Sequence, residues 1–172
     1  TEHNFYFNHS HFLYEELIRV PLIITFPGKI PKSKIIQQQV QSIDIMPTIL
    51  DLVNVKKEII IEGESLTPLM KSKKWHYRPY AFSESAYWPA PQCIRASDWK
   101  LMHNRKNGNY ELYNLKEDPK ESNNLIYIEK DKLEFLKQKL VEHIKHARRH
   151  RINKSLLSGD TKEKLRSLGY VQ

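Results

Sequence analysis

The stretch WKLMHNRKNGNYELYNL, residues 99–115, contains the strongest local folding signal in the chain. Two short segments rich in aromatic and branched apolar residues, 99–103 and 110–115, flank Asn107-Gly108. An Asn-Gly pair between two such segments is the most specific short signal of a β-hairpin, because both residues tolerate the positive φ that a tight turn requires. Residues 99–115 are therefore predicted to form two antiparallel strands.

The segments on either side of this hairpin extend the pattern. Tyr80–Ser85 and Gln92–Ala96 are also predicted strands, and Ser97-Asp98 is predicted to join the latter to Trp99 in a tight turn. Downstream, apolar residues recur on one side of a predicted helix that is suited to cover the sheet. These residues are Leu133, Leu136, Leu140, Ile144 and Ala147. The second half of the chain is thus predicted to be an antiparallel meander followed by a helix.

The first half has a different pattern. Val20–Phe26 is an apolar run that predicts a buried strand, ended by a turn at Pro27-Gly28. Residues 43–52 have helical apolar spacing, with Ser42 or Asp44 as the candidate cap and Pro47 in the first turn. Lys56–Lys74 is charged and is predicted to be an irregular connection. We place a domain boundary near residue 78.

Composition and charge restrict the function classes. Hydrophobic residues make up 40% of the 172 residues, which is enough for a packed core and excludes overall disorder. The net charge of +8 favours polyanionic partners. Part of the excess lies between Lys145 and Lys154, where the end of a solvated helix is the favoured interpretation. The single cysteine excludes an intrachain disulfide, and no apolar run reaches the roughly 18 residues of a membrane span.

Five phrases in order along the chain resemble conserved blocks of the sulfatase family. Together they are more specific than any periodicity, and they span nearly the whole chain. The phrases are LYEELIRVPLII (13–24) followed by Pro27-Gly28, SIDIMPTIL (42–50), GESLTPL (63–69), ELYNLKEDPKESNNL (111–125) and LRSLGYV (165–171).

The resemblance implies a fold with two parts. Residues 1–78 would be the C-terminal end of an alkaline-phosphatase-like α/β catalytic domain. Residues 79–172 would be a small α+β subdomain, with a four-stranded antiparallel sheet and a C-terminal helix. The resemblance also implies a periplasmic or secreted location and a sulfated small molecule or glycan as substrate, with no specific nucleic-acid partner.

The chemistry implied by the family uses two groups. A Cys or Ser in a C/S-x-P-x-R motif becomes formylglycine, and a divalent cation, usually calcium, neutralises the sulfate oxygens. Cys93 does not lie in such a motif and is predicted to be a strand residue in a small core. Glu2-His3 resembles the residues that follow the family's metal-binding segment. We therefore expect the nucleophile and the metal ligands to precede Thr1, and this chain alone to be inactive.

One substrate contact is expected within the chain. In the family a Lys or His shortly before the Tyr-Glu pair reaches the sulfate, where a cation stabilises the charge that develops as the ester breaks. His9 is the first candidate and His11 the second, with a simple loop contact as the alternative for each. His9 precedes Ser10 rather than the glycine that is usual after this histidine, which is a departure from the family pattern.

Other charged and aromatic residues are assigned structural roles. Arg19 is predicted to pair with Glu15 or Glu16, Lys100 to be solvated, and Trp88 and Trp99 to pack. Two alternative functions stay open at this point. One is a phosphodiester or phosphonate hydrolase of the same superfamily, and the other is a basic module that binds polyanions. The absence of a nucleic-acid-binding motif counts against the second.

Overall fold

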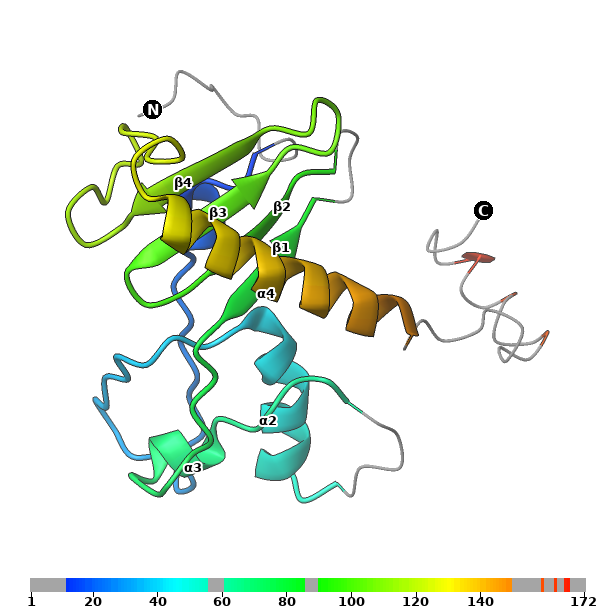
Figure 1. Ribbon diagram of the computed structural model, residues 1–172. Helices are drawn as coiled ribbons and strands as arrows, with labels where there is room; N and C mark the ends of the chain where they lie inside the picture. The colour runs from blue at the N-terminus through cyan, green and yellow to red at the C-terminus, as the bar shows by residue number, and fades with distance from the viewer. Residues whose placement is uncertain are drawn as a thin grey trace. The chain divides into compact units, whose positions relative to one another are not determined.

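The computed structural model describes residues 12–55, 61–85 and 90–149, together with residues 159, 163, 166 and 167. His9, His11 and Trp88 lie outside the described residues. The chain forms two compact units, residues 1–137 and 138–172. The elements in chain order are α1 (Glu15–Ile18), the 3₁₀ helix η1 (Ser42–Asp44), α2 (Ile45–Leu52), α3 (Thr67–Met70), β1 (Ala81–Glu84), β2 (Gln92–Arg95), β3 (Trp99–His103), β4 (Tyr110–Asn114) and α4 (Lys130–Arg149) (Figure 1).

The four strands form one antiparallel sheet in the order β1-β2-β3-β4, which confirms the predicted meander. The turn after β2 is tight, with the Ala96 amide donating to the Trp99 carbonyl at 2.8 Å. The connection after β3 is wider than a two-residue turn. The Asn104 amide donates to the Asn109 carbonyl at 2.8 Å, and Gly108 has a positive φ of 74° whereas Asn107 does not. The glycine is therefore the residue that lets this hairpin close.

Strand pairing decides which side chains share a face of the sheet. Pairing of Cys93 with Met102 places both on one face, and pairing of Ile94 with Leu101 places both on the other. All four side chains are buried, so both faces of this small sheet must be covered.

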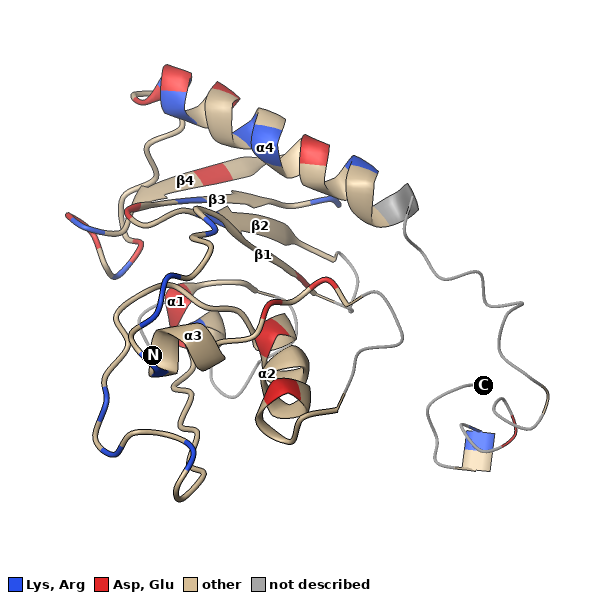
Figure 2. Ribbon diagram, turned by 90° about the horizontal axis from the view of Figure 1, so that it is seen from below, with Lys and Arg blue, Asp and Glu red and all other residues tan. Residues whose placement is uncertain are grey.

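The start of α4 lies along one face of the sheet (Figure 2), and its contacts with Trp99 and Tyr110 identify this face as the one that contains Ile94. The Lys132 ammonium lies 5.4 Å from the centre of the Trp99 ring, and the Lys137 ammonium lies 5.4 Å from that of Tyr110. Leu136 is 1% exposed. The helix predicted from the apolar stripe is confirmed, with Leu136 on its buried side.

Residues 12–18 cover the opposite face. Leu13 joins a buried cluster with Cys93 and Met102 of the sheet, and Tyr14 and Ile18 pack against this cluster. This segment comes from the part of the chain that precedes the sheet by more than 60 residues. The sheet is therefore buried between an N-terminal segment and the helix that follows it.

A second apolar cluster centres on α3. Leu66, Leu69 and Met70 are buried, and Ile24, Ile30, Ile36, Val40 and Trp75 pack against them. The prediction that residues 56–74 are wholly irregular is therefore wrong, because the apolar residues of Leu66–Met70 form a helical turn within that core. No helix in the described part of the chain is both long and apolar enough to cross a membrane.

The predicted strand at Val20–Phe26 does not form. No strand pairs with it within the described residues, and Val20 is 69% and Ile23 88% exposed. A strand requires the backbone hydrogen bonds of a neighbouring strand, and none of the described strands pairs with this segment. Met46 and Ile49 of α2, and Val53 directly after it, are also about half exposed. Apolar surface gathered in this way is typical of an interface.

Candidate functional site

A buried cluster of charged side chains fastens residues 12–19 to the sheet. Lys100 of β3 is 0% exposed. Its Nζ lies 2.8 Å from Glu121 Oε1 and 3.5 Å from Glu15 Oε1. Glu121 Oε2 also accepts the backbone N–H of Glu15 at 2.6 Å. Lys100 therefore links α1 to the loop after β4 through two carboxylates.

Arg95 of β2 completes the cluster. Its Nε lies 3.1 Å from both carboxylate oxygens of Glu15, and its Nη1 donates to Gln39 Oε1 at 2.5 Å. The four side chains Glu15, Arg95, Lys100 and Glu121 carry no net charge as a group. Burial of such a group is tolerated only because each charge has partners, and removal of one partner is costly.

This arrangement corrects two predictions about charged residues. Lys100 is not solvated, because strand register places it beside Arg95 on the face that residues 12–18 cover. Glu15 pairs with Arg95 and Lys100, and no ion pair joins Arg19 to Glu15 or Glu16 among the described residues. Trp99 is half-buried under Lys132, in agreement with the predicted packing role.

Two of the sequence phrases meet in this cluster. Glu15 belongs to the phrase at residues 13–24, and Glu121 belongs to the phrase at 111–125. Their separation of 106 positions explains why sequence reasoning did not bring them together. The sequence did contain one indication of their role, because each phrase places a glutamate among apolar or turn-forming residues.

A tyrosine pair lies beside the cluster on the same face. The Tyr14 hydroxyl donates to Glu111 Oε2 at 2.9 Å, and the Tyr113 hydroxyl donates to the same oxygen at 2.8 Å. Burial, together with the nearby Glu111 carboxylate, raises the pKa of both tyrosines. Both hydroxyls therefore stay protonated and orient the start of α1 against β4.

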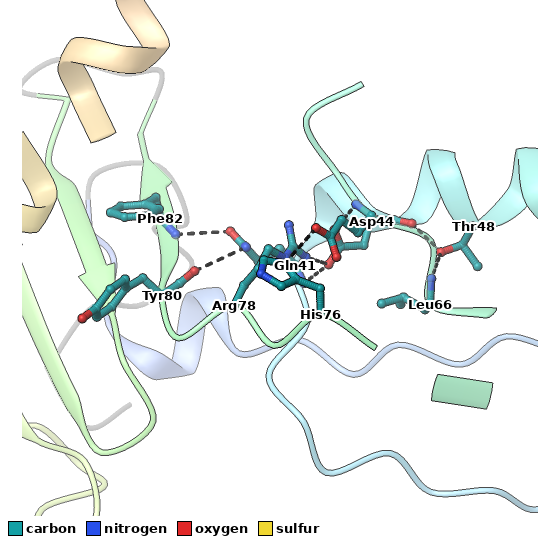
Figure 3. Close-up of polar contacts among 9 residues, drawn as sticks. Gln41, Asp44, Thr48, Leu66, His76, Arg78, Tyr80 and Phe82 are labelled. Atoms are coloured by element: carbon teal, nitrogen blue, oxygen red, sulfur yellow. Dashed lines mark hydrogen bonds and ion pairs between the residues drawn. The ribbon is translucent and has the colours of Figure 1, made fainter. Parts of the chain in front are cut away.

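Asp44 organises a second polar network, at the start of α2 (Figure 3). Its carboxylate is 0% exposed. It accepts the amides of Gln41 at 2.9 Å and Glu64 at 3.0 Å and pairs with the Arg78 guanidinium. Asp44 occupies the predicted N-cap position of α2, but its side chain makes no capping bond to that helix and accepts the Gln41 amide in a capping box at the start of η1, while Ser42 is the first residue of η1 and does not cap α2. Asp44 instead ties two loops to the helix start.

The same network contacts the edge of the sheet. Gln41 Nε2 donates to the Tyr80 carbonyl at 3.5 Å, and Gln41 Oε1 accepts the Phe82 amide at 3.3 Å (Figure 3). These two bonds satisfy backbone groups on the outer side of β1, which is an edge strand. Gln41 therefore protects an edge that would otherwise be open to pairing with another chain.

Cys93 is 1% exposed on β2, as the sequence predicted. Burial raises the pKa of its thiol to about 11, so the reactive thiolate is scarce at neutral pH. We expect Cys93 to resist an aromatic disulfide reagent at pH 8 in the native chain and to react at once in urea. The matched control is Ser97→Cys in a Cys93→Ala background, an exposed thiol that should react rapidly without urea. Equal rates for the two native proteins would contradict the buried position.

The described residues contain no group of three or more His, Cys, Asp or Glu side chains that could hold a metal ion. The two candidate substrate contacts, His9 and His11, lie outside the described residues, so their roles stay predictions. What the described residues do form is a scaffold, in which the segment that follows His9 and His11 is fixed to the sheet by Glu15.

An antiparallel four-stranded sheet followed by a helix is the architecture that the resemblance to sulfatases implies for a C-terminal subdomain. The family model described as "N-sulphoglucosamine sulphohydrolase, C-terminal" matches residues 1–150. The chain belongs to this family of sulfatases and corresponds to its C-terminal part.

Similar proteins agree with this assignment. An N-acetylglucosamine-6-O-sulfatase of Bacteroides thetaiotaomicron is 32% identical over 127 residues, which cover 67% of this chain and 22% of the relative. A solved structure in complex with its substrate D-glucosamine-2-N,6-O-disulfate is 30% identical, with a TM-score of 0.54, and covers 63% of this chain and 24% of that protein.

A phosphonate monoester hydrolase of Agrobacterium radiobacter shares the fold, with a TM-score of 0.53 at 20% identity over 70% of this chain and 27% of that one. The chain thus spans about a quarter of the length of the proteins that it resembles.

Proposed function

We propose that this chain acts as the C-terminal part of a sulfatase that hydrolyses a sulfate ester on a sugar. The names of the relatives support this substrate class, since both the 6-O-sulfatase and the protein bound to a disulfated glucosamine act on sulfated amino sugars. The observation that carries the proposal is the ion cluster of Glu15, Arg95, Lys100 and Glu121. It joins two family phrases in one buried structure.

In this proposal the cluster is a positioning device. Glu15 is held on both its carboxylate and its backbone amide, and Leu13 is buried against the sheet. The residues just before them include His9 and His11, the proposed sulfate contacts. A fixed anchor two to six residues away limits how far such a side chain can move, and small displacements of a charge-stabilising group reduce catalysis strongly.

Formylglycine and calcium, which the family resemblance implies, do not fit the described residues. Cys93 is buried in the sheet and lacks the motif that would be modified. Oxygen ligands for calcium are needed in sets of six to eight, and the described residues offer no acidic cluster of that kind. We propose that both groups belong to other parts of the sulfatase, and no step is assigned to Cys93.

The proposal is tested on the complete reading frame that contains this chain. We expect a C/S-x-P-x-R motif upstream, and sulfate release from glucosamine 6-sulfate that is lost when the motif Cys or Ser is changed to Ala. The 172-residue chain alone serves as the inactive control. If the encoded protein cleaves a phosphonate monoester but no sulfate ester, this result would contradict the proposal and favour the phosphonate hydrolase alternative.

A further inference from the structure

A cleft of about 220 Å³ lies at the end of the sheet that contains the β2–β3 turn. The end of α1, that turn and the residues after β4 contribute its walls. Its charged and polar lining comprises Glu15, Arg19, Arg95, Ser97, Asp98 and Lys116. These residues come from three separate parts of the chain, so the fold alone brings them together.

Backbone hydrogen bonds hold the walls of this cleft in place. The Leu115 amide donates to the Asp98 carbonyl at 2.7 Å, which joins the end of β4 to the β2–β3 turn. The Arg19 amide donates to the Glu15 carbonyl at 2.9 Å, which closes α1. Asn114 Oδ1 accepts the Lys116 amide at 3.1 Å. The cleft is therefore a built feature of the fold.

The charges of the cleft favour an anion. Arg95 and Lys100 form ion pairs with the Glu15 carboxylate, so the negative charge of Glu15 is neutralised inside the protein. Arg19 and Lys116 are exposed at the rim, and no ion pair engages either side chain in the described part of the chain. Asp98 opposes them at the rim. Two cations therefore face one acidic group at the mouth of the cleft.

We propose that this cleft binds one sulfate group, with Arg19 and Lys116 as its direct contacts. The planar guanidinium of Arg19 is suited to grip two oxyanion oxygens, and the ammonium of Lys116 adds a point charge. The volume is below the roughly 300–1,000 Å³ of typical small-molecule sites, so the cleft suits one sulfated sugar unit rather than an oligosaccharide. The choice of a sulfated sugar over free sulfate rests on the proposed function, whereas the oxyanion chemistry does not.

The test is isothermal titration of the 172-residue chain at constant ionic strength, with glucosamine 6-sulfate, inorganic sulfate and unsulfated glucosamine. We expect saturable binding of the sulfated sugar that weakens at least about tenfold in the double variant Arg19→Gln/Lys116→Gln. Asp98→Asn should strengthen binding, because it removes the opposing charge. Lys106→Gln is the matched control, since it removes an exposed cation from the loop at the other end of β3.

The outcomes separate the sources of the anion and the two proposals. Tighter binding of the sulfated sugar than of sulfate supports a saccharide site, and equal binding supports a site for the oxyanion alone. No saturable binding, equal binding of unsulfated glucosamine, or an equal loss in Lys106→Gln would overturn the proposal. Since no turnover is measured, failure here leaves the sulfatase assignment intact, and failure of the activity assay leaves this binding result intact.

Discussion

Replacement of Lys100 by Met is expected to reduce the free energy of unfolding by about 3–5 kcal/mol, because it removes the buried cation that pairs with two buried carboxylates, Glu15 and Glu121. Lys100 is 0% exposed between Glu15 and Glu121, so water cannot take the place of the ammonium. The methionine keeps the length of the side chain, which limits the change in packing. Urea unfolding followed by far-UV circular dichroism measures the effect.

Two variants separate the buried charge from a general loss of positive charge. Lys106→Met removes an exposed lysine from the adjacent hairpin and should change stability by no more than about 0.5 kcal/mol. The double variant Lys100→Met/Glu121→Gln should recover part of the loss, since it removes one of the two negative charges beside the missing ammonium and keeps an oxygen for the Glu15 amide. If the Lys100→Met variant is as stable as the Lys106→Met variant, the ion cluster does not contribute to stability.

Local sequence signals were sufficient for the elements whose partners are close in the chain. The meander around Asn107-Gly108 was predictable because each strand pairs with the next one, and the turn chemistry lies between them. The burial of Cys93 followed from the same pattern. Helix α4 was predictable because its apolar stripe has a single period over 20 residues.

The errors concern features that depend on distant partners. Lys100 was predicted to be solvated because the residues near it in the chain do not indicate its partners. Those partners, Glu15 and Glu121, come from distant segments that bury it. Val20–Phe26 has the pattern of a strand, but no described strand pairs with it, and Val20, Leu22 and Ile23 stay exposed. The ion cluster could be predicted only by knowing that residues 12–18 cover the sheet. Sequence periodicity contains no information about such a contact.

Replacement of Gly63 by Ala is expected to destabilise the first half of the chain by about 2–3 kcal/mol or more, because the new methyl group collides with backbone. A Cβ atom at this position would lie 2.0 Å from the Ile43 carbonyl oxygen and 2.5 Å from its carbon. Gly63 does not have a positive φ, so a glycine is required here for space and not for an unusual backbone conformation.

The collision would act on the Asp44 network directly. In the segment after Gly63, the Glu64 amide donates to Asp44 Oδ1 at 3.0 Å and the Leu66 amide donates to Thr48 Oγ1 at 2.9 Å. A shift large enough to admit a methyl group must lengthen these bonds. We therefore expect faster hydrogen exchange at the Glu64 and Leu66 amides in Gly63→Ala, with a lower midpoint of urea unfolding.

Gly108→Ala is the matched control, because it makes the same chemical change without a collision. Gly108 has a φ of 74° and no atom within 4 Å of the added carbon, so its cost is the left-handed backbone alone, roughly 1–2 kcal/mol. A cost for Gly63→Ala that is no larger than that for Gly108→Ala would contradict the close approach of residues 43 and 63. If hydrogen exchange at the Glu64 and Leu66 amides is faster in Gly63→Ala but not in Gly108→Ala, the close approach of residues 43 and 63 is the cause of the destabilisation. The hairpin glycine makes no contact with the Asp44 network.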